Sequence, residues 1–167
     1  MPATVTSLRH GRATTTVDHA PSRSTFCYYR PPGGDDDGKK ARVRQIVATG
    51  LPPEPAPFSH AVVAKGVVFT AQLPIRADGT AETGSATAQA ELALSNLARA
   101  ISAAGATLDD VAQVILFITH GEDKPAIDAV YARYFRQPYP SRACVVVKEL
   151  VVPGTRLEVL AYATLPE

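Results

Sequence analysis

Three side chains in the last third of the chain have the types and spacing needed to handle a small carboxylate. Arg142 and Cys144 lie in the stretch YPSRACVVV, Tyr139–Val147, and Glu158 follows on a later apolar segment. The planar guanidinium of an arginine matches a carboxylate through two parallel hydrogen bonds, which lysine does poorly. A glutamate can orient or deprotonate a water molecule. This set would hold a carboxylate and direct water at a neighbouring atom.

The position of Arg142 raises the question of what it meets. The stretch reads as a buried β-strand, and a charge at its mouth is costly unless a partner compensates it. From the residues alone, Arg142 either binds a substrate carboxylate or pairs with Glu158 or a carbonyl at a subunit interface. Cys144 points to the same face of the strand as Arg142. Nothing nearby in the sequence would activate its thiol, so we interpret it as a small buried side chain and not as a nucleophile.

Composition narrows the class of protein. The chain has 167 residues, 46% of them apolar, and a net charge of +1. It lacks a basic stripe and an apolar run long enough to span a bilayer, which argues against nucleic-acid and membrane partners. Cys27 and Cys144 lie far apart, which fits a reducing cytoplasm. The histidines show no metal-ligand spacing, so neither a metal nor another cofactor is expected.

Residues 1–43 differ from the rest of the chain. They are rich in Thr, Arg, Pro and Gly and contain the run PPGGDDDGKK, which suits neither a helix nor a central strand. We expect an N-terminal extension and favour a plain arm over a targeting peptide, because an amphipathic apolar face is missing. Ser24–Tyr29 has the composition of a short strand, so the arm is expected to be partly ordered against the domain.

Residues 44–167 show regular patterning. Strands are predicted over 44–50, twice within 60–75, and over 111–119, 142–150 and 156–165. The apolar residues Leu94, Leu97 and Ile101 recur at helical spacing within 82–111, where Gly105 can end the helix. A second helix is predicted over 124–135, with Pro125 in its first turn.

This order predicts an α+β fold, with two helices on one face of a mixed sheet. The segments VILFI and CVVV are apolar on both faces, whereas the helices cover only one. We therefore expect other copies of the chain to cover the second face, in a closed homo-oligomer.

Several ordered blocks resemble one known family. FSHAVVAKGVVFTAQLPI, NLARAISAAGATLDDVAQVILFIT, AIDAVYARYF, PSRACVVVKEL and LEVLAYATL are similar to the successive signature blocks of the reactive intermediate deaminases, the Rid family, also called YjgF-like or L-PSP proteins. The resemblance runs from about residue 44 to residue 165. It implies a chorismate-mutase-like fold in a homotrimer whose sheets face an inner barrel, with sites in the clefts between subunits.

The resemblance also implies an activity and its residues. Family members that carry the arginine hydrolyse 2-imino or 2-enamino acids to 2-keto acids and ammonia. Arg142 and Glu158 match the family's arginine and glutamate, and Cys144 matches a cysteine that lines the site mainly through its backbone.

Two departures limit the match. A family serine is absent from the segment FTAQLP, where Thr70 and Ala71 stand, and a family tyrosine is replaced by Phe58. Asp128 stands where asparagine is common and is interpreted as a surface acid. The pocket, lined by Phe58, Thr70, Ala71 and Cys144 around Arg142, is therefore expected to be more apolar than in relatives.

The predicted function is hydrolytic deamination of a small imine or enamine carboxylate, specialised for a larger, less polar substrate within a biosynthetic pathway. The alternative is a trimer of the same family that binds a small carboxylate, or regulates, without chemistry. A ribonuclease activity ranks lowest, because the proposed cleft has no cluster of basic residues.

Overall fold

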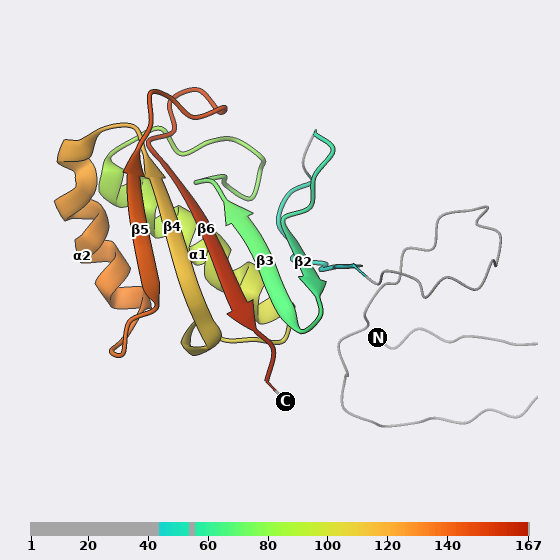
Figure 1. The fold of residues 1–167 in the computed structure, drawn as a ribbon. Coiled ribbons are helices and arrows are strands. Elements are labelled where there is room, and N and C mark those ends of the chain that lie inside the picture. The colour runs from blue at the N-terminus through green and yellow to red at the C-terminus, as the bar shows by residue number, and fades with distance from the viewer. Residues whose placement is uncertain (1–43, 54–55, 167) are drawn as a thin grey trace, which may run out of the picture.

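Six strands form one mixed sheet with two helices packed on it (Figure 1). The computed structural model describes residues 44–53 and 56–166, so the strand predicted at 24–29 lies outside the described residues. The strands are β1 (Gln45–Ile46), β2 (Ala61–Ala64), β3 (Val67–Gln72), β4 (Val111–Ile118), β5 (Ser141–Val146) and β6 (Leu157–Thr164). The helices are α1 (Ala86–Ala103) and α2 (Lys124–Tyr134), with 3₁₀ turns η1 (Leu108–Asp110) and η2 (Gly121–Asp123). The predicted α+β class is confirmed.

The strand order in the sheet is β1-β2-β3-β6-β4-β5. Only β4 and β5 run parallel, and every other neighbouring pair is antiparallel. Parallel neighbours need a crossover connection, which α2 supplies between β4 and β5. The late strand β6 lies between β3 and β4, in the middle of the sheet, and β5 lies at its edge (Figure 1).

The helix α1 forms where the apolar spacing predicted it. The Ser85 side chain caps its first turn by accepting from the Ala88 amide at 3.2 Å. Gly105 follows the last turn with φ of +88°, the left-handed conformation that glycine adopts without strain. The stripe of Leu94, Leu97 and Ile101 is fully buried against the sheet. The second helix also begins as predicted, with Pro125 in its first turn.

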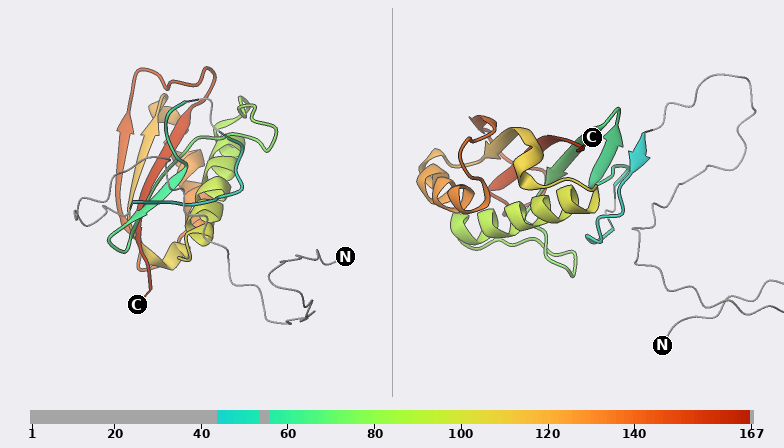
Figure 2. Two further views of the ribbon diagram at one scale, coloured as in Figure 1. Left: turned by 90° about the vertical axis from the view of Figure 1, so that its right-hand side faces the viewer. Right: turned by 90° about the horizontal axis from the view of Figure 1, so that it is seen from below.

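Both helices lie on one side of the sheet (Figure 2). The covered face of the central strands is buried at alternating positions, such as Val114 and Leu116 on β4 and Leu157, Val159 and Ala161 on β6. The alternate residues point to the other face, which we call the open face. Its apolar side chains are partly or largely exposed: Val62, Ala64, Val67, Phe69, Ala71, Ile115, Phe117, Leu160 and Tyr162.

Two predicted strands differ from the observed ones. The first is only Gln45–Ile46 long, and the strand predicted over 142–150 ends at Val146. The interpretation of this strand as buried was wrong for the single chain. Five of the six residues of β5 are exposed, because the strand has a neighbour on one side only.

A fully buried glutamine on α1 ties down the segment that enters β6. The side chain of Gln89 donates to the carbonyl oxygens of Gly84 at 3.2 Å and Gly154 at 3.1 Å, and it accepts from the Arg156 amide at 2.7 Å. Arg156 is the residue before β6, so Gln89 fixes the path of the chain just ahead of Glu158.

Within the part of the chain that the structure describes, no helix is both long enough and apolar enough to cross a membrane.

Candidate substrate-binding site

Arg142 lies near the start of the edge strand β5 and turns toward α2. It stands opposite Val114 of β4, whose side chain is on the helix-covered face. Its guanidinium carbon is 4.6 Å from the centre of the Tyr131 ring, a distance at which a cation is attracted to an aromatic face. Tyr131 in turn stacks on Phe135 with ring centres 4.4 Å apart. The arginine therefore rests on a rigid aromatic platform, with 25% of its side chain still exposed.

Asp128, which we interpreted as a surface acid, is instead the ion-pair partner of Arg142. Its Oδ1 lies 2.9 Å from Nη1 of Arg142, and its Oδ2 accepts from Nζ of Lys124 at 2.5 Å. Burial by itself would raise the pKa of Asp128, but the hydrogen bond from Lys124 and the charge of Arg142 outweigh burial and hold the pKa below its ordinary value. Asp128 is therefore ionised, and we call Lys124, Asp128 and Arg142 the charged triad.

Two polar atoms beside the triad lack an aligned hydrogen bond. Oδ1 of Asp128 is buried and meets Arg142 at ion-pair distance without hydrogen-bond alignment. The hydroxyl of Tyr131 is buried too and has no hydrogen-bond partner among the described residues. Burial raises the pKa of Tyr131 to about 12, against the opposing effect of Arg142, so the hydroxyl keeps its proton and remains a donor.

Cys144 shares the helix-covered face with Arg142, as its spacing predicted. It stands opposite Leu116 of β4, packs against the core and is partly buried. It forms no disulfide within the described residues. This placement is compatible with lining a site at Arg142, and that role stays a prediction.

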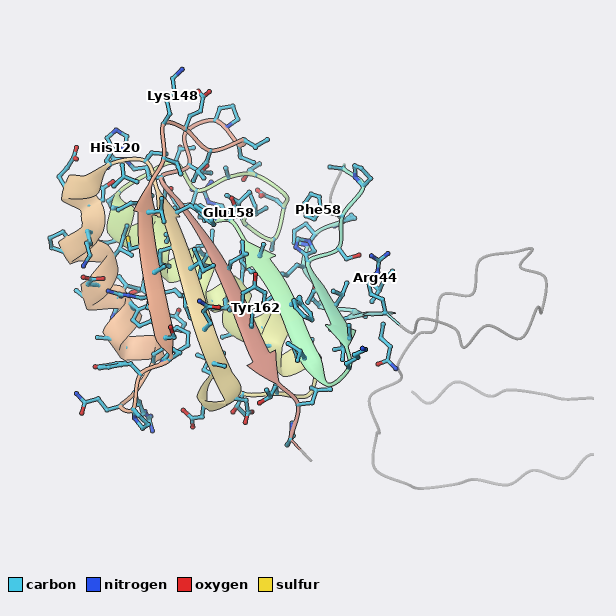
Figure 3. The ribbon with its side chains drawn as sticks, in the orientation of Figure 1. Arg44, Phe58, His120, Lys148, Glu158 and Tyr162 are labelled. Atoms are coloured by element: carbon cyan, nitrogen blue, oxygen red, sulfur yellow. The ribbon has the colours of Figure 1, made fainter. Side chains whose placement is uncertain are left out.

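Glu158 lies on the open face of the central strand β6. It pairs in register with Phe117 of β4 and shares its face with Tyr162 (Figure 3). Burial among these side chains raises the pKa of Glu158 above its ordinary value. A carboxylate with a raised pKa accepts a proton more readily than an ordinary carboxylate does. The raised pKa is compatible with a water-activating acid, and that role of Glu158 stays a prediction.

Arg142 and Glu158 are on opposite faces of the sheet. Arg142 is level with Val114 on β4, whereas Glu158 is level with Phe117, which is three residues or about 10 Å further along that strand. Within one chain, a small substrate cannot touch both side chains. The possible pairing of Arg142 with Glu158 is also excluded within one chain, because the ion-pair partner of Arg142 is Asp128.

The remaining predicted site residues divide in the same way. Thr70 is buried on the helix-covered face, where its hydroxyl donates to the His60 carbonyl at 2.7 Å and accepts from Gln72 at 2.8 Å. Ala71 is on the open face, opposite Leu160 of β6, and so shares that face with Glu158. Phe58 is 54% exposed in the segment before β2, with its ring edge-on to His60. None of the three contacts Arg142.

A cavity of about 660 Å³ lies where β4 and β5 finish and β6 begins. It is lined by Thr119, His120 and residues 148–156, which form the connection from β5 to β6. None of the predicted site residues lines it. Figure 3 shows His120 and Lys148 at this end, beyond Glu158.

Among residues 44–53 and 56–166, no three His, Cys, Asp or Glu side chains lie close enough together to hold a metal ion.

The contacts of the charged triad were not predicted from the sequence. One signal was available: Lys124, Asp128 and Tyr131 recur at i, i+4 and i+7 on the predicted second helix, which places them on one helical face. The approach of that face to Arg142 depends on how α2 packs beside β5, which no local pattern encodes.

Known proteins are similar to this chain in sequence over most of the domain. Residues 51–165, well over half of the chain, match the family model described as Endoribonuclease L-PSP. A protein named 3-aminoacrylate deaminase RutC, from Acinetobacter baylyi, is 35% identical over 120 residues, 71% of this chain and 94% of that protein. A protein named 2-iminobutanoate/2-iminopropanoate deaminase, from Dermatophagoides farinae, is 34% identical over 110 residues, 64% of this chain and 86% of that protein.

A solved structure shows the same architecture. The crystal structure of a putative endoribonuclease from Thermotoga maritima superposes with a TM-score of 0.70 at 30% identity, covering 75% of this chain and all of that one. The chain belongs to the L-PSP family, which is also called the Rid or YjgF-like family. The names of its relatives support imine deamination as the function at the level of the family.

Proposed function

We propose that this protein hydrolyses 2-imino or 2-enamino acids to 2-keto acids and ammonia. The observation that carries the proposal is the preset guanidinium of Arg142, which is held on the Tyr131 ring and still partly exposed. The names of the two deaminase relatives supply the substrate class, a small carboxylate with a carbon–nitrogen double bond or its enamine form.

Arg142 binds the substrate carboxylate in this proposal. Its platform of Tyr131 and Phe135 limits the orientations of the guanidinium, so little freedom is lost when a ligand binds. The carboxylate takes N–H groups of Arg142 that face away from Asp128. The hydroxyl of Tyr131 is a further donor next to this site.

Glu158 handles the water. The oxygen of water attacks the carbon of the protonated C=N group while Glu158 accepts one of the water protons, which produces a carbinolamine with a neutral amino group. Glu158 then returns this proton to the nitrogen. The C–N bond breaks with its electron pair going to the nitrogen, the hydroxyl oxygen becomes the carbonyl oxygen, and the hydroxyl proton passes to the departing ammonia, which leaves as ammonium. One water is consumed and one ammonia is released, and Glu158 ends in the state in which it began. Its raised pKa suits both proton transfers.

The active site is composed of two copies of the chain. Arg142 and Glu158 face opposite sides of the sheet, so the arginine of one copy must meet the glutamate of another. The apolar open face and the exposed edge strand β5 supply surfaces for such packing. We propose a homotrimer with its sites between subunits.

The substrate side chain is larger and less polar than that of the smallest imino acids. Phe58 presents an exposed aromatic ring without a hydroxyl, and Ala71 adds no polar group beside Leu160. The hydroxyl of Thr70 is engaged by His60 and Gln72, so it does not replace the missing serine.

The test measures ammonia release from imino acids generated in situ, over a series of side-chain sizes. Arg142→Ala is expected to reduce the rate to the spontaneous one, whereas Arg136→Ala, which changes an exposed arginine just after α2, is expected to leave it unchanged. Light scattering of the same samples is expected to give a trimer. A wild-type rate equal to the spontaneous rate would refute the catalytic proposal and favour a carboxylate-binding protein, and a stable monomer would refute the shared site.

A further inference from the structure

The charged triad places a carboxylate, that of Asp128, next to the guanidinium of Arg142. Asp128 is ionised and in contact with Arg142, on the same guanidinium whose remaining N–H groups would bind a ligand carboxylate. We propose that Asp128 is a specificity-determining residue, which makes the site prefer the protonated, zwitterionic form of a 2-imino acid over the 2-keto acid of the same carbon skeleton. This inference rests on the proposed function, because it assigns the carboxylate site to Arg142.

The arginine is not able to leave Asp128 easily when a ligand arrives. One face of its guanidinium lies on the Tyr131 ring, and Tyr131 is 4% exposed and stacked on Phe135. Asp128 is held on its other side by Lys124, one helical turn earlier on α2. A ligand therefore meets Arg142 and Asp128 together, as a fixed pair of opposite charges.

Geometry makes the two carboxylates close neighbours. An oxygen of the ligand within hydrogen-bond distance of Arg142 shares the guanidinium with Oδ1 of Asp128, which is 2.9 Å from Nη1. The two anions are then separated by roughly the width of one guanidinium, about 5–6 Å, which is within the range of strong interaction between charges. Asp128 thus weakens the binding of any carboxylate that arrives without a positive charge.

A protonated 2-imino acid brings that positive charge. Its iminium nitrogen is attached to the carbon next to the carboxylate, so the negative and positive ends of the ligand match the positive and negative ends of the Arg142–Asp128 pair. A 2-keto acid has a carbonyl oxygen at the same position, which Asp128 repels. Hydrolysis therefore turns a ligand that the pair favours into one that it disfavours, and the product leaves.

The charges of the triad offer a graded test. Lys124, Asp128 and Arg142 sum to +1, Asp128→Asn raises the sum to +2, and Lys124→Gln lowers it to zero. The dissociation constant of 2-oxobutanoate, a 2-keto acid, is measured by calorimetry on the full chain for wild type and both variants. Asp128→Asn is expected to bind it roughly tenfold more tightly and Lys124→Gln several-fold more weakly, and the gain should shrink at high salt.

Two controls separate this electrostatic role from a structural one. Asp109→Asn removes the same charge from an exposed site on η1 and should leave the affinity unchanged. Thermal unfolding and circular dichroism confirm that each variant is folded. If Asp128 only supported the fold, both triad variants would bind the keto acid more weakly, and that result, or equal affinity in all three proteins, would overturn the inference.

The keto-acid binding experiment tests the role of Asp128 separately from the proposed deaminase function. Tighter keto-acid binding by Asp128→Asn supports the inference even if the wild type releases no ammonia above the spontaneous rate. Catalysed ammonia release together with unchanged or weaker keto-acid binding by Asp128→Asn would retain the proposed function and overturn the inference. Absence of keto-acid binding to wild type and to Asp128→Asn would also overturn it.

Discussion

Replacing Gln89 with leucine should lower both the stability of the protein and its rate of ammonia release. Gln89 is 0% exposed and joins α1 to Gly84, Gly154 and the Arg156 amide. Leucine has a similar size but no polar atoms, so all three hydrogen bonds are lost. The segment that they hold leads directly into β6 and Glu158.

The expected loss in the free energy of unfolding depends on whether each former hydrogen-bond partner of Gln89 can bond to water instead. Gly84 and Gly154 are exposed, so water can replace the glutamine at their carbonyls, at a cost of about 0.5 kcal/mol each. The Arg156 amide is only partly exposed and loses its partner, which costs about 1–3 kcal/mol. The leucine recovers about 1 kcal/mol of apolar burial, which leaves a net loss of about 1–3 kcal/mol in the free energy of unfolding. For a domain of about 120 residues, that corresponds to a fall in Tm of about 4–12 °C.

The assay is thermal and urea unfolding at a fixed protein concentration, followed by far-ultraviolet circular dichroism because the chain has no tryptophan. Ser95→Leu, an exposed change from a polar residue to leucine on the same helix, serves as the matched control and should shift Tm little. Ammonia release measured below both transitions should fall for Gln89→Leu. A Tm shift no larger than that of the control would refute the reasoning.

Two further predictions concern the residues around the proposed chemistry. Burial raises the folded-state pKa of Glu158 above 4.5, so the contribution of Glu158 to stability is full below pH 4.5 and is lost as the pH rises through the raised pKa. Glu158→Gln should therefore be more stable than wild type at pH 7, and the difference should vanish near pH 4. Thermal unfolding at the two pH values measures this difference. A variant less stable than wild type at pH 7 would contradict this. Phe58→Tyr adds a hydroxyl to an exposed ring without crowding it. The variant should have a higher kcat/KM for the smallest imino acids relative to larger ones, because the new hydroxyl can donate to a polar substrate or to water. An unchanged ratio would count against a place for Phe58 in the site.

The regular elements were predictable because their signals are local. The stripe of Leu94, Leu97 and Ile101 defined α1, Pro125 marked the first turn of α2, and the alternation along β6 separated Leu157 from Glu158. The extent of β5 was not predictable in this way. Its apolar residues suit a buried strand, but its position at the edge of the sheet leaves them exposed in the single chain.

The sequence allowed candidate site residues to be named, but it did not predict how they are arranged, and their roles stay predictions. The i, i+2 spacing put Arg142 and Cys144 on one face of a strand, and the register with β4 confirms it. Glu158 lies on the opposite face because of the way β6 pairs in register with β4. That pairing joins segments that are distant in the sequence, so no local pattern predicts it.

The sequence by itself determined the helices, the strands, the family and the types of side chain available for chemistry, because these depend on neighbours along the chain. Only the tertiary structure decided what Arg142 meets. The crossover through α2 lays Asp128 and Tyr131 against the arginine, and the central position of β6 turns Glu158 to the opposite face. Contact across separate elements sets both results, so the charge beside Arg142 and the separation of Arg142 from Glu158 within one chain follow from the fold.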